Sequence, residues 1–108
     1  MTGTPTKSEP LCSLLGEDPE LRDIVELFVE EMAERISSLL DGLNGSDWEG
    51  LRRRAHQLKG AAGSYGFPPI TDSASRLEEA IRKSHPEGEI RRLVEELVDL
   101  CGRAQAAP

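Results

Sequence analysis

His56 lies in a short stretch whose residue types could support covalent chemistry with phosphate. Lys59 follows it by three positions, Gly60 by four and Gly63 by seven. A neutral imidazole exists near physiological pH and is a nucleophile. An ammonium group one helical turn away can balance the negative charge of a phosphoryl group attached to that ring. The spacing therefore points to His56 as the reacting group and to Lys59 as its charge balance.

A helix starting near residue 46 and ending near Gly66 would hold His56 outside the hydrophobic core. At ~100° per residue, His56 faces away from the apolar stripe of this helix, and Arg52 and Lys59 lie on the same outward flank. The flank is cationic and, at its two glycines, bare of side chains. The apolar stripe itself consists of Trp48, Leu51, Ala55, Leu58, Ala62 and Tyr65.

Gly60 and Gly63 make this helix less stable, by about 1 kcal/mol each relative to alanine. A sequence that keeps them favours close approach by another surface. We expect that surface to belong to a partner protein, bound at Arg52, Gly60 and Gly63. The alternative is that the glycines admit a neighbouring helix of the same chain. Gly66 is expected to terminate the helix, because glycine tolerates the left-handed conformation found at helix ends.

A single long helix is expected before this one, over residues 18–43. Asp18 has the properties of an N-cap and Pro19 fits the first helical position, while either Asn44 or Gly45 could end the helix. Its apolar residues step by three and four: Leu21, Val25, Phe28, Met32, Ile36, Leu39 and Leu43.

Capping boxes are expected at the start of two helices. Ser46 with Glu49 would begin the second helix, and Ser84 with Glu87 the fourth. Pro68-Pro69 breaks the chain and opens the third, whose apolar residues are Ile70, Ala74, Leu77 and Ile81. The fourth carries Ile90, Leu93, Val94, Leu97, Leu100 and Cys101. No segment has the alternating pattern of a strand.

Connections this short require successive helices to run antiparallel. The predicted fold is therefore all-α, an up-down-up-down four-helix bundle over residues 11–104. Leu11, Leu14 and Leu15 would form a short N-terminal capping segment. Residues 1–10, rich in threonine and proline, predict a flexible tail.

Composition excludes several classes of protein. A chain of 108 residues has room for one domain, and a net charge of -7 argues against binding nucleic acid. Two distant cysteines predict neither a disulfide framework nor a zinc site. Residues 1–10 lack the apolar core of a signal peptide, and no apolar run reaches the ~18 residues needed to span a membrane. We expect a cytoplasmic monomer with no membrane association.

The stretch Ala55-His-Gln-Leu-Lys-Gly-Ala-Ala-Gly-Ser-Tyr-Gly-Phe67 resembles the signature of histidine phosphotransfer domains. In that family the histidine is followed by lysine and glycine at the third and fourth positions and by glycine at the tenth, as His56 is by Lys59, Gly60 and Gly66. The segment is similar to the phosphotransfer domains of chemotaxis histidine kinases and of hybrid sensor kinases. This similarity leaves the donor open between a receiver aspartyl phosphate and a histidine kinase.

The resemblance implies a phosphorelay carrier of two-component signalling rather than a self-sufficient enzyme. His56 would accept the phosphoryl group and pass it to a response-regulator receiver domain. Glu78, at the matching position on the next helix, would hydrogen-bond the imidazole and orient it. The family binds no cofactor of its own, and Mg²⁺ is expected on the partner receiver domain.

Two other functions are compatible with amphipathic helices. A plain helical adaptor would look similar, but it has no need of the cluster formed by His56, Lys59 and Gly60. The dimerisation module of a sensor kinase also carries a phosphorylated histidine. That family places an acidic residue directly after the histidine and a proline soon after, whereas here Gln57 follows and the next proline is Pro68. His85 precedes a proline and is interpreted as a loop or capping residue.

Overall fold

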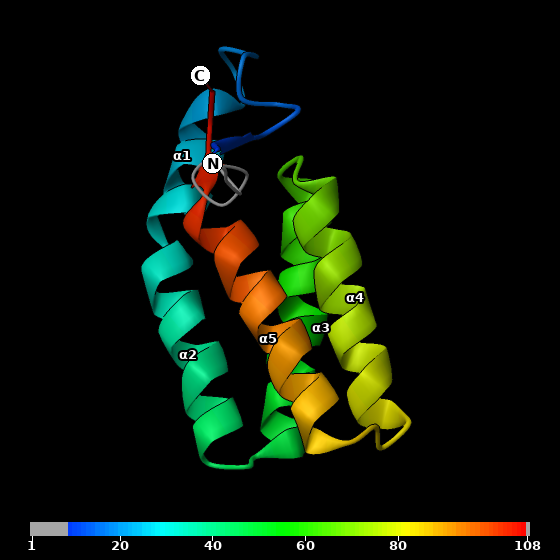
Figure 1. The fold of residues 1–108 in the computed structure, drawn as a ribbon. Helices are drawn as coiled ribbons and strands as arrows, with labels where there is room; N and C mark the ends of the chain where they lie inside the picture. Colours follow the sequence, from blue (N-terminus) through cyan, green and yellow to red (C-terminus); the bar gives the residue numbers. More distant parts are fainter. Residues whose placement is uncertain (1–8, 108) are drawn as a thin grey trace, which may run out of the picture.

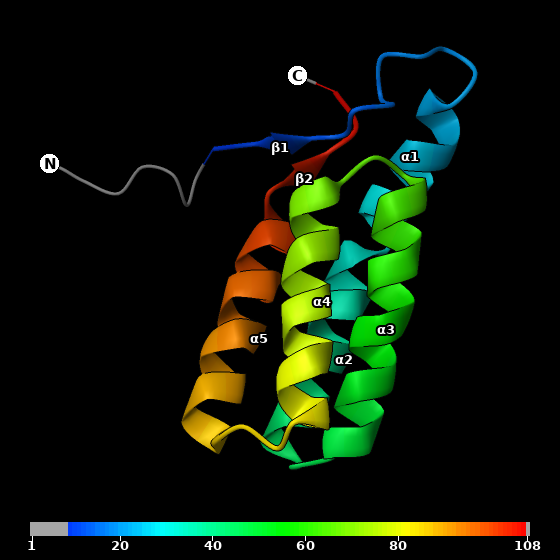
Figure 2. The ribbon, with the colours of Figure 1, turned by 90° about the vertical axis from the view of Figure 1, so that its right-hand side faces the viewer.

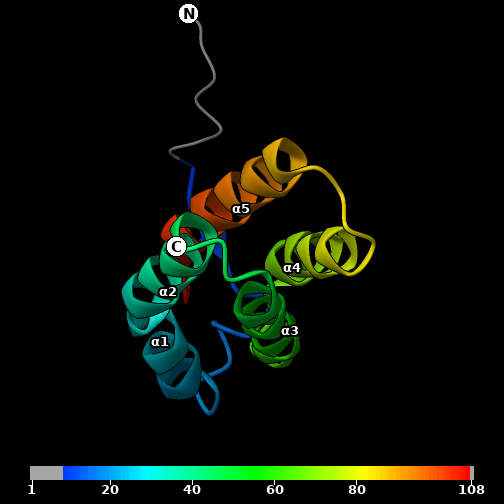
Figure 3. The ribbon, with the colours of Figure 1, turned by 90° about the horizontal axis from the view of Figure 1, so that it is seen from below.

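The computed structural model describes residues 9–107, which form an antiparallel helical bundle. Its helices are α1 (Arg22–Glu30), α2 (Met32–Asn44), α3 (Trp48–Ser64), α4 (Pro68–Arg82) and α5 (Glu87–Gly102). Helices α1 and α2 follow one another along one column, and α3, α4 and α5 supply the other three (Figures 1 and 3). The all-α four-helix bundle predicted from the sequence is confirmed. Residues 1–8 of the predicted tail lie outside the described residues.

The first column differs from the single helix expected over residues 18–43. Leu21, not Asp18, occupies the N-cap of α1, and the Asp18 carboxylate accepts the backbone N–H of Glu20 in the preceding turn at 2.9 Å. Glu31 separates α1 from α2, and its N–H is shared between the carbonyls of Leu27 and Phe28. The single-helix prediction was therefore wrong, because the apolar pattern continues through Glu31 and carries no trace of this altered hydrogen bonding.

Ser46 ends α2 and does not cap α3. Its φ of 53° is left-handed, and the N–H of the next residue, Asp47, bonds back to the carbonyl of Gly42 at 2.9 Å, as in a helix C-terminal motif. Asp47 is the N-cap of α3, where its carboxylate accepts the N–H of Gly50 at 3.0 Å. The predicted Ser46 capping box was wrong. Serine and aspartate both occur at helix ends, and here the N-cap is Asp47, one position later than predicted.

At the remaining helix ends, the predictions for Gly66 and Pro68-Pro69 were confirmed and the one for Ser84 was wrong. Gly66 has a φ of 83° and ends α3, and Pro68 with Pro69 opens α4, as expected. Ser84 is left-handed, with a φ of 56°, and terminates α4. Helix α5 begins after Pro86 without a side-chain cap, so the Ser84 capping box was also wrong.

The two ends of the described chain form a feature that the sequence did not predict. Strand β1 (Leu11–Cys12) pairs in parallel with β2 (Ala104–Gln105) across the end of the bundle where α3 leads to α4 (Figure 2). Ser13 then donates its hydroxyl to the carbonyl of Tyr65 at 2.6 Å. The expected capping segment is thus extended over residues 11–12 before it turns. Strands of two residues are too short to show an alternating pattern.

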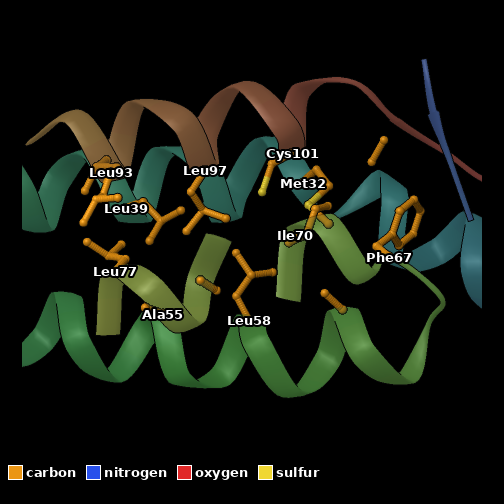
Figure 4. Close-up of a cluster of buried hydrophobic side chains, with 14 of the residues drawn as sticks. Met32, Leu39, Ala55, Leu58, Phe67, Ile70, Leu77, Leu93, Leu97 and Cys101 are labelled. Carbon is orange, nitrogen blue, oxygen red and sulfur yellow. The ribbon is translucent and has the colours of Figure 1, made fainter. Parts of the chain in front are cut away.

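The core is built from the inward faces of all four columns (Figure 4). On α3 the buried apolar residues are Leu51, Ala55, Leu58 and Ala62. Trp48 and Tyr65, at the ends of the same stripe, are half-buried. Both cysteines are free, and burial raises the pKa of the Cys101 thiol to about 12. The core thus fixes the rotation of α3, which decides where His56 points.

Candidate functional site

His56 projects from the middle of α3 into solvent. Leu51, Ala55 and Leu58 are at most 2% exposed, whereas the His56 side chain is 61% exposed. Residues next to a buried position on a helix point about 100° away from it. Burial of Ala55 therefore turns His56 out of the core and leaves it accessible to another protein.

Glu78 of α4 holds the imidazole from one side. It follows the buried Leu77 along α4, and its own side chain is only 11% exposed. Oε2 of Glu78 lies 2.9 Å from Nδ1 of His56. An ionised carboxylate can only accept a hydrogen bond, so Nδ1 must carry the proton in this contact. In the neutral ring this leaves the lone pair on Nε2.

Two cations of α3 also lie beside this carboxylate. Nζ of Lys59 is 2.8 Å from Oε1 of Glu78, and Nη1 of Arg52 is 3.7 Å from Oε2. The hydrogen bond from Lys59 holds the pKa of the Glu78 carboxyl below its ordinary value, aided by the bond with His56 and opposed by burial. Arg52, Lys59 and His56 thus surround one ionised, nearly buried carboxylate.

Acid should weaken the protein through Glu78. Because its folded-state pKa lies below the ordinary 4.5, its stabilising contribution is complete above that value and is lost as pH falls through the folded pKa. Glu78→Gln should lower the free energy of unfolding by about 1–3 kcal/mol at pH 7. The difference from the parent should shrink toward pH 3.

Urea unfolding at both pH values measures this contribution. Glu95→Gln, at an exposed carboxylate of α5, is the matched control and should show no comparable difference at either pH. A Glu78→Gln defect of equal size at pH 7 and pH 3 would show that the charge of Glu78 is not what stabilises the fold.

Packing among residues 9–107 does not require glycine at positions 60 and 63. A Cβ added at Gly60 would meet no atom within 4 Å, and one at Gly63 would lie in ordinary contact, 3.5 Å from Oγ1 of Thr71. At Gly66, by contrast, the added Cβ would come within 2.6 Å of Oγ of Ser13. No neighbouring helix of the described chain therefore explains Gly60, which lies exposed one turn beyond His56.

Two residues of the site were missed in the sequence. Glu49 binds Arg52 through two contacts, at 2.6 and 3.1 Å, instead of capping α3. The spacing of three residues between Glu49 and Arg52 on one helix could have predicted this ion pair. Thr71 of α4 donates its hydroxyl to the carbonyl of Lys59 at 3.3 Å and so ties the two helices together beside the site. Nothing in the sequence pairs these two residues.

His85 has different surroundings. It lies in the connection between α4 and α5, and its Nδ1 is 3.4 Å from a carboxylate oxygen of Glu89, one turn ahead. Within residues 9–107, no three acidic, histidine or cysteine side chains are grouped so as to hold a metal ion. None of the described helices is both long and apolar enough to cross a membrane.

A helical bundle that presents a carboxylate-bound histidine to solvent beside a lysine has the features expected of a histidine phosphotransfer module. The chain belongs to the Hpt domain family, because the family model described as Hpt domain matches residues 23–107. Membership implies histidine phosphotransfer in phosphorelay signalling and interaction with kinases and receiver domains. Neither the curated proteins nor the solved structures include a match to the chain.

Proposed function

We propose that this chain carries a phosphoryl group on Nε2 of His56. The donor would be a receiver aspartyl phosphate or a histidine kinase, and the acceptor a response-regulator receiver domain. The observation that carries the proposal is the 2.9 Å contact between Nδ1 of His56 and Glu78, on a ring that is otherwise 61% exposed. It favours the tautomer in which Nε2 is the nucleophile.

Transfer from a receiver would be an in-line displacement at phosphorus. The Nε2 lone pair forms the P–N bond while the bond from phosphorus to the aspartyl oxygen breaks, and the aspartate leaves as a carboxylate. The phosphorylated ring keeps its proton on Nδ1, from which it donates a hydrogen bond to Glu78. Lys59 would neutralise part of the phosphoryl charge. The reverse displacement, by the aspartate of a second receiver, returns His56 to its starting state.

The partner would supply the rest of the catalytic machinery. The Mg²⁺ that phosphoryl transfer requires is proposed to be held by acidic residues of the receiver, and the chain itself is proposed to need no cofactor. Arg52, Gly60 and Gly63 would form the docking face around His56. Gly60 and Gly63 carry no side chain and so would allow a protein surface to approach closely. Arg52 would attract acidic groups on that surface.

Incubation with a panel of phosphorylated receiver domains tests the proposal. A carrier becomes labelled, and the label is acid-labile and alkali-stable as expected of phosphohistidine. A helical adaptor binds without taking up label. The bundle also completes its four columns within one chain, whereas a sensor-kinase dimerisation module would need helices from a second copy. A labelled monomer would therefore favour the carrier over both alternatives.

Lys59 and Glu78 should be separable by their effects on the ring. Glu78→Ala should shift the neutral tautomer away from Nδ1–H by roughly tenfold or more, since a hydrogen bond to a charged group is worth about 1.5–3 kcal/mol. Lys59→Ala should slow phosphorylation without a comparable shift. Nitrogen NMR of the His56 ring above pH 8 reports the tautomer, and the labelling rate is measured on the same samples. Unchanged tautomers in Glu78→Ala would reduce Glu78 to a structural carboxylate.

A further inference from the structure

The Glu78 carboxylate depends on two close partners in this structure, Lys59 and His56. Oε1 accepts from Lys59 at 2.8 Å and Oε2 from His56 at 2.9 Å, and the side chain is only 11% exposed. A nearly buried carboxylate is stable only while it is paired. Lys59 therefore has two tasks, because it pairs with Glu78 in this structure and is proposed to pair with the phosphoryl group after transfer.

Phosphorylation of Nε2 places the new negative charge on the side of the ring away from Nδ1. A lysine that turns toward the phosphoryl group leaves Oε1 of Glu78 without its closest cation. Unless another cation replaces Lys59, the ionised form of the carboxylate becomes less stable. The bond that orients His56 would then weaken in the phosphorylated state, where the return transfer begins.

Arg52 is placed to replace Lys59. It lies one turn before His56 on the same helix, and its Nη1 is already 3.7 Å from Oε2 of Glu78. Its present partner is Glu49, which is 68% exposed. Exposed ion pairs contribute little, so Arg52 can shift at small cost. A guanidinium has five N–H donors and can hold two carboxylates at once.

We propose that Arg52 is a positioning residue that moves from Glu49 toward Glu78 when Lys59 turns to the phosphoryl group. Glu49 keeps Arg52 beside the site in the unphosphorylated state. The exchange keeps Glu78 paired and the Nδ1 proton in place throughout the transfer cycle. This inference rests on the proposed function, because it requires a phosphoryl group on His56.

A partner-free reaction separates this role from docking. Phosphoramidate donates its phosphoryl group to Nε2 with release of ammonia, so no receiver surface is involved. The variants are Arg52→Gln and, as a matched control, Arg53→Gln, which removes the same charge from an exposed position of the same helix. Nitrogen NMR follows the Arg52 guanidinium and the Nδ1 proton of His56 before and after phosphorylation, and phosphorus NMR follows the lifetime of the phosphohistidine.

Phosphorylation should shift the Arg52 guanidinium signals of the parent protein. In Arg52→Gln the unphosphorylated ring should still donate its Nδ1 proton to Glu78, because Lys59 keeps that carboxylate paired. Only the phosphorylated form should show a weakened Nδ1 bond and a phosphohistidine lifetime changed several-fold. Arg53→Gln should match the parent in both states.

Each other outcome is decisive. If His56 is phosphorylated but the Arg52 signals are the same in both states, or Arg52→Gln and Arg53→Gln behave alike, the exchange is wrong and the carrier function stands. If Arg52→Gln alters the unphosphorylated ring equally, Arg52 is a structural partner of Glu78 and not an exchange partner. If neither phosphoramidate nor any phosphorylated receiver labels His56, the carrier function itself fails, and the exchange fails with it.

Discussion

His56→Gln should accept no phosphoryl group and should fold like the parent protein. The ring supplies the only nucleophile of the proposed mechanism, and an amide nitrogen cannot replace it. The side chain is 61% exposed, so its replacement should change the free energy of unfolding by no more than about 1 kcal/mol. Labelling by phosphorylated receiver domains and urea unfolding measure the two effects on the same preparation.

His85→Gln is the control for this substitution. It removes the chain's other histidine, which lies in the connection between α4 and α5 with its Nδ1 3.4 Å from a carboxylate oxygen of Glu89. This variant should label at the parental rate. Uptake by His56→Gln, or loss of uptake in His85→Gln, would show that the phosphoryl group is carried elsewhere.

Leucine at Gly60 or Gly63 should block transfer from a receiver without harming the fold. A Cβ at Gly60 meets no atom of residues 9–107 within 4 Å. Leucine is also the better helix former by roughly 1 kcal/mol, so the melting temperature should stay the same or rise. The larger side chain should instead obstruct a docked receiver. We expect the rate of transfer to fall by on the order of tenfold or more, which corresponds to a loss of about 1.4 kcal/mol in the transition state.

Gly88→Leu is the matched control, because Gly88 is another exposed helical glycine at which an added Cβ meets nothing within 4 Å. It lies on α5, away from His56. Transfer should be normal in this variant. Labelling of Gly60→Leu by phosphoramidate should also be normal, since that reaction needs no docking. A parallel loss of stability and transfer would instead assign the glycines to internal packing.

The bundle could be predicted from the sequence because the spacing of apolar residues shows which side of each helix is buried. The three-and-four spacing of Leu51, Ala55 and Leu58 defines the inward face of α3, and His56 follows as an outward residue. The break at Glu31 and the left-handed Ser46 concern backbone hydrogen bonds. Side-chain periodicity carries no information about these bonds, so they could not be predicted in the same way.

The composition of the site shows a similar division. His56, Lys59 and Gly60 could be grouped from their spacing on one helix, whereas Glu78 entered only through the family resemblance, because it lies 22 residues from His56 on another helix. That Lys59 binds this carboxylate in the unphosphorylated protein could not be inferred from spacing at all. This contact depends on how α3 and α4 pack. If Lys59 balances the phosphoryl charge, as proposed, it has to leave Glu78 first.

Sequential transfer between two receivers tests the central claim most directly. The protein is labelled by one phosphorylated receiver, separated from it, and mixed with a second, unphosphorylated receiver in the presence of Mg²⁺. We expect the label to leave His56 and to be recovered on the aspartate of the second receiver. Across the panel of receivers, label that stays on the protein or is released only as inorganic phosphate, at the rate seen in buffer alone, would contradict a carrier function.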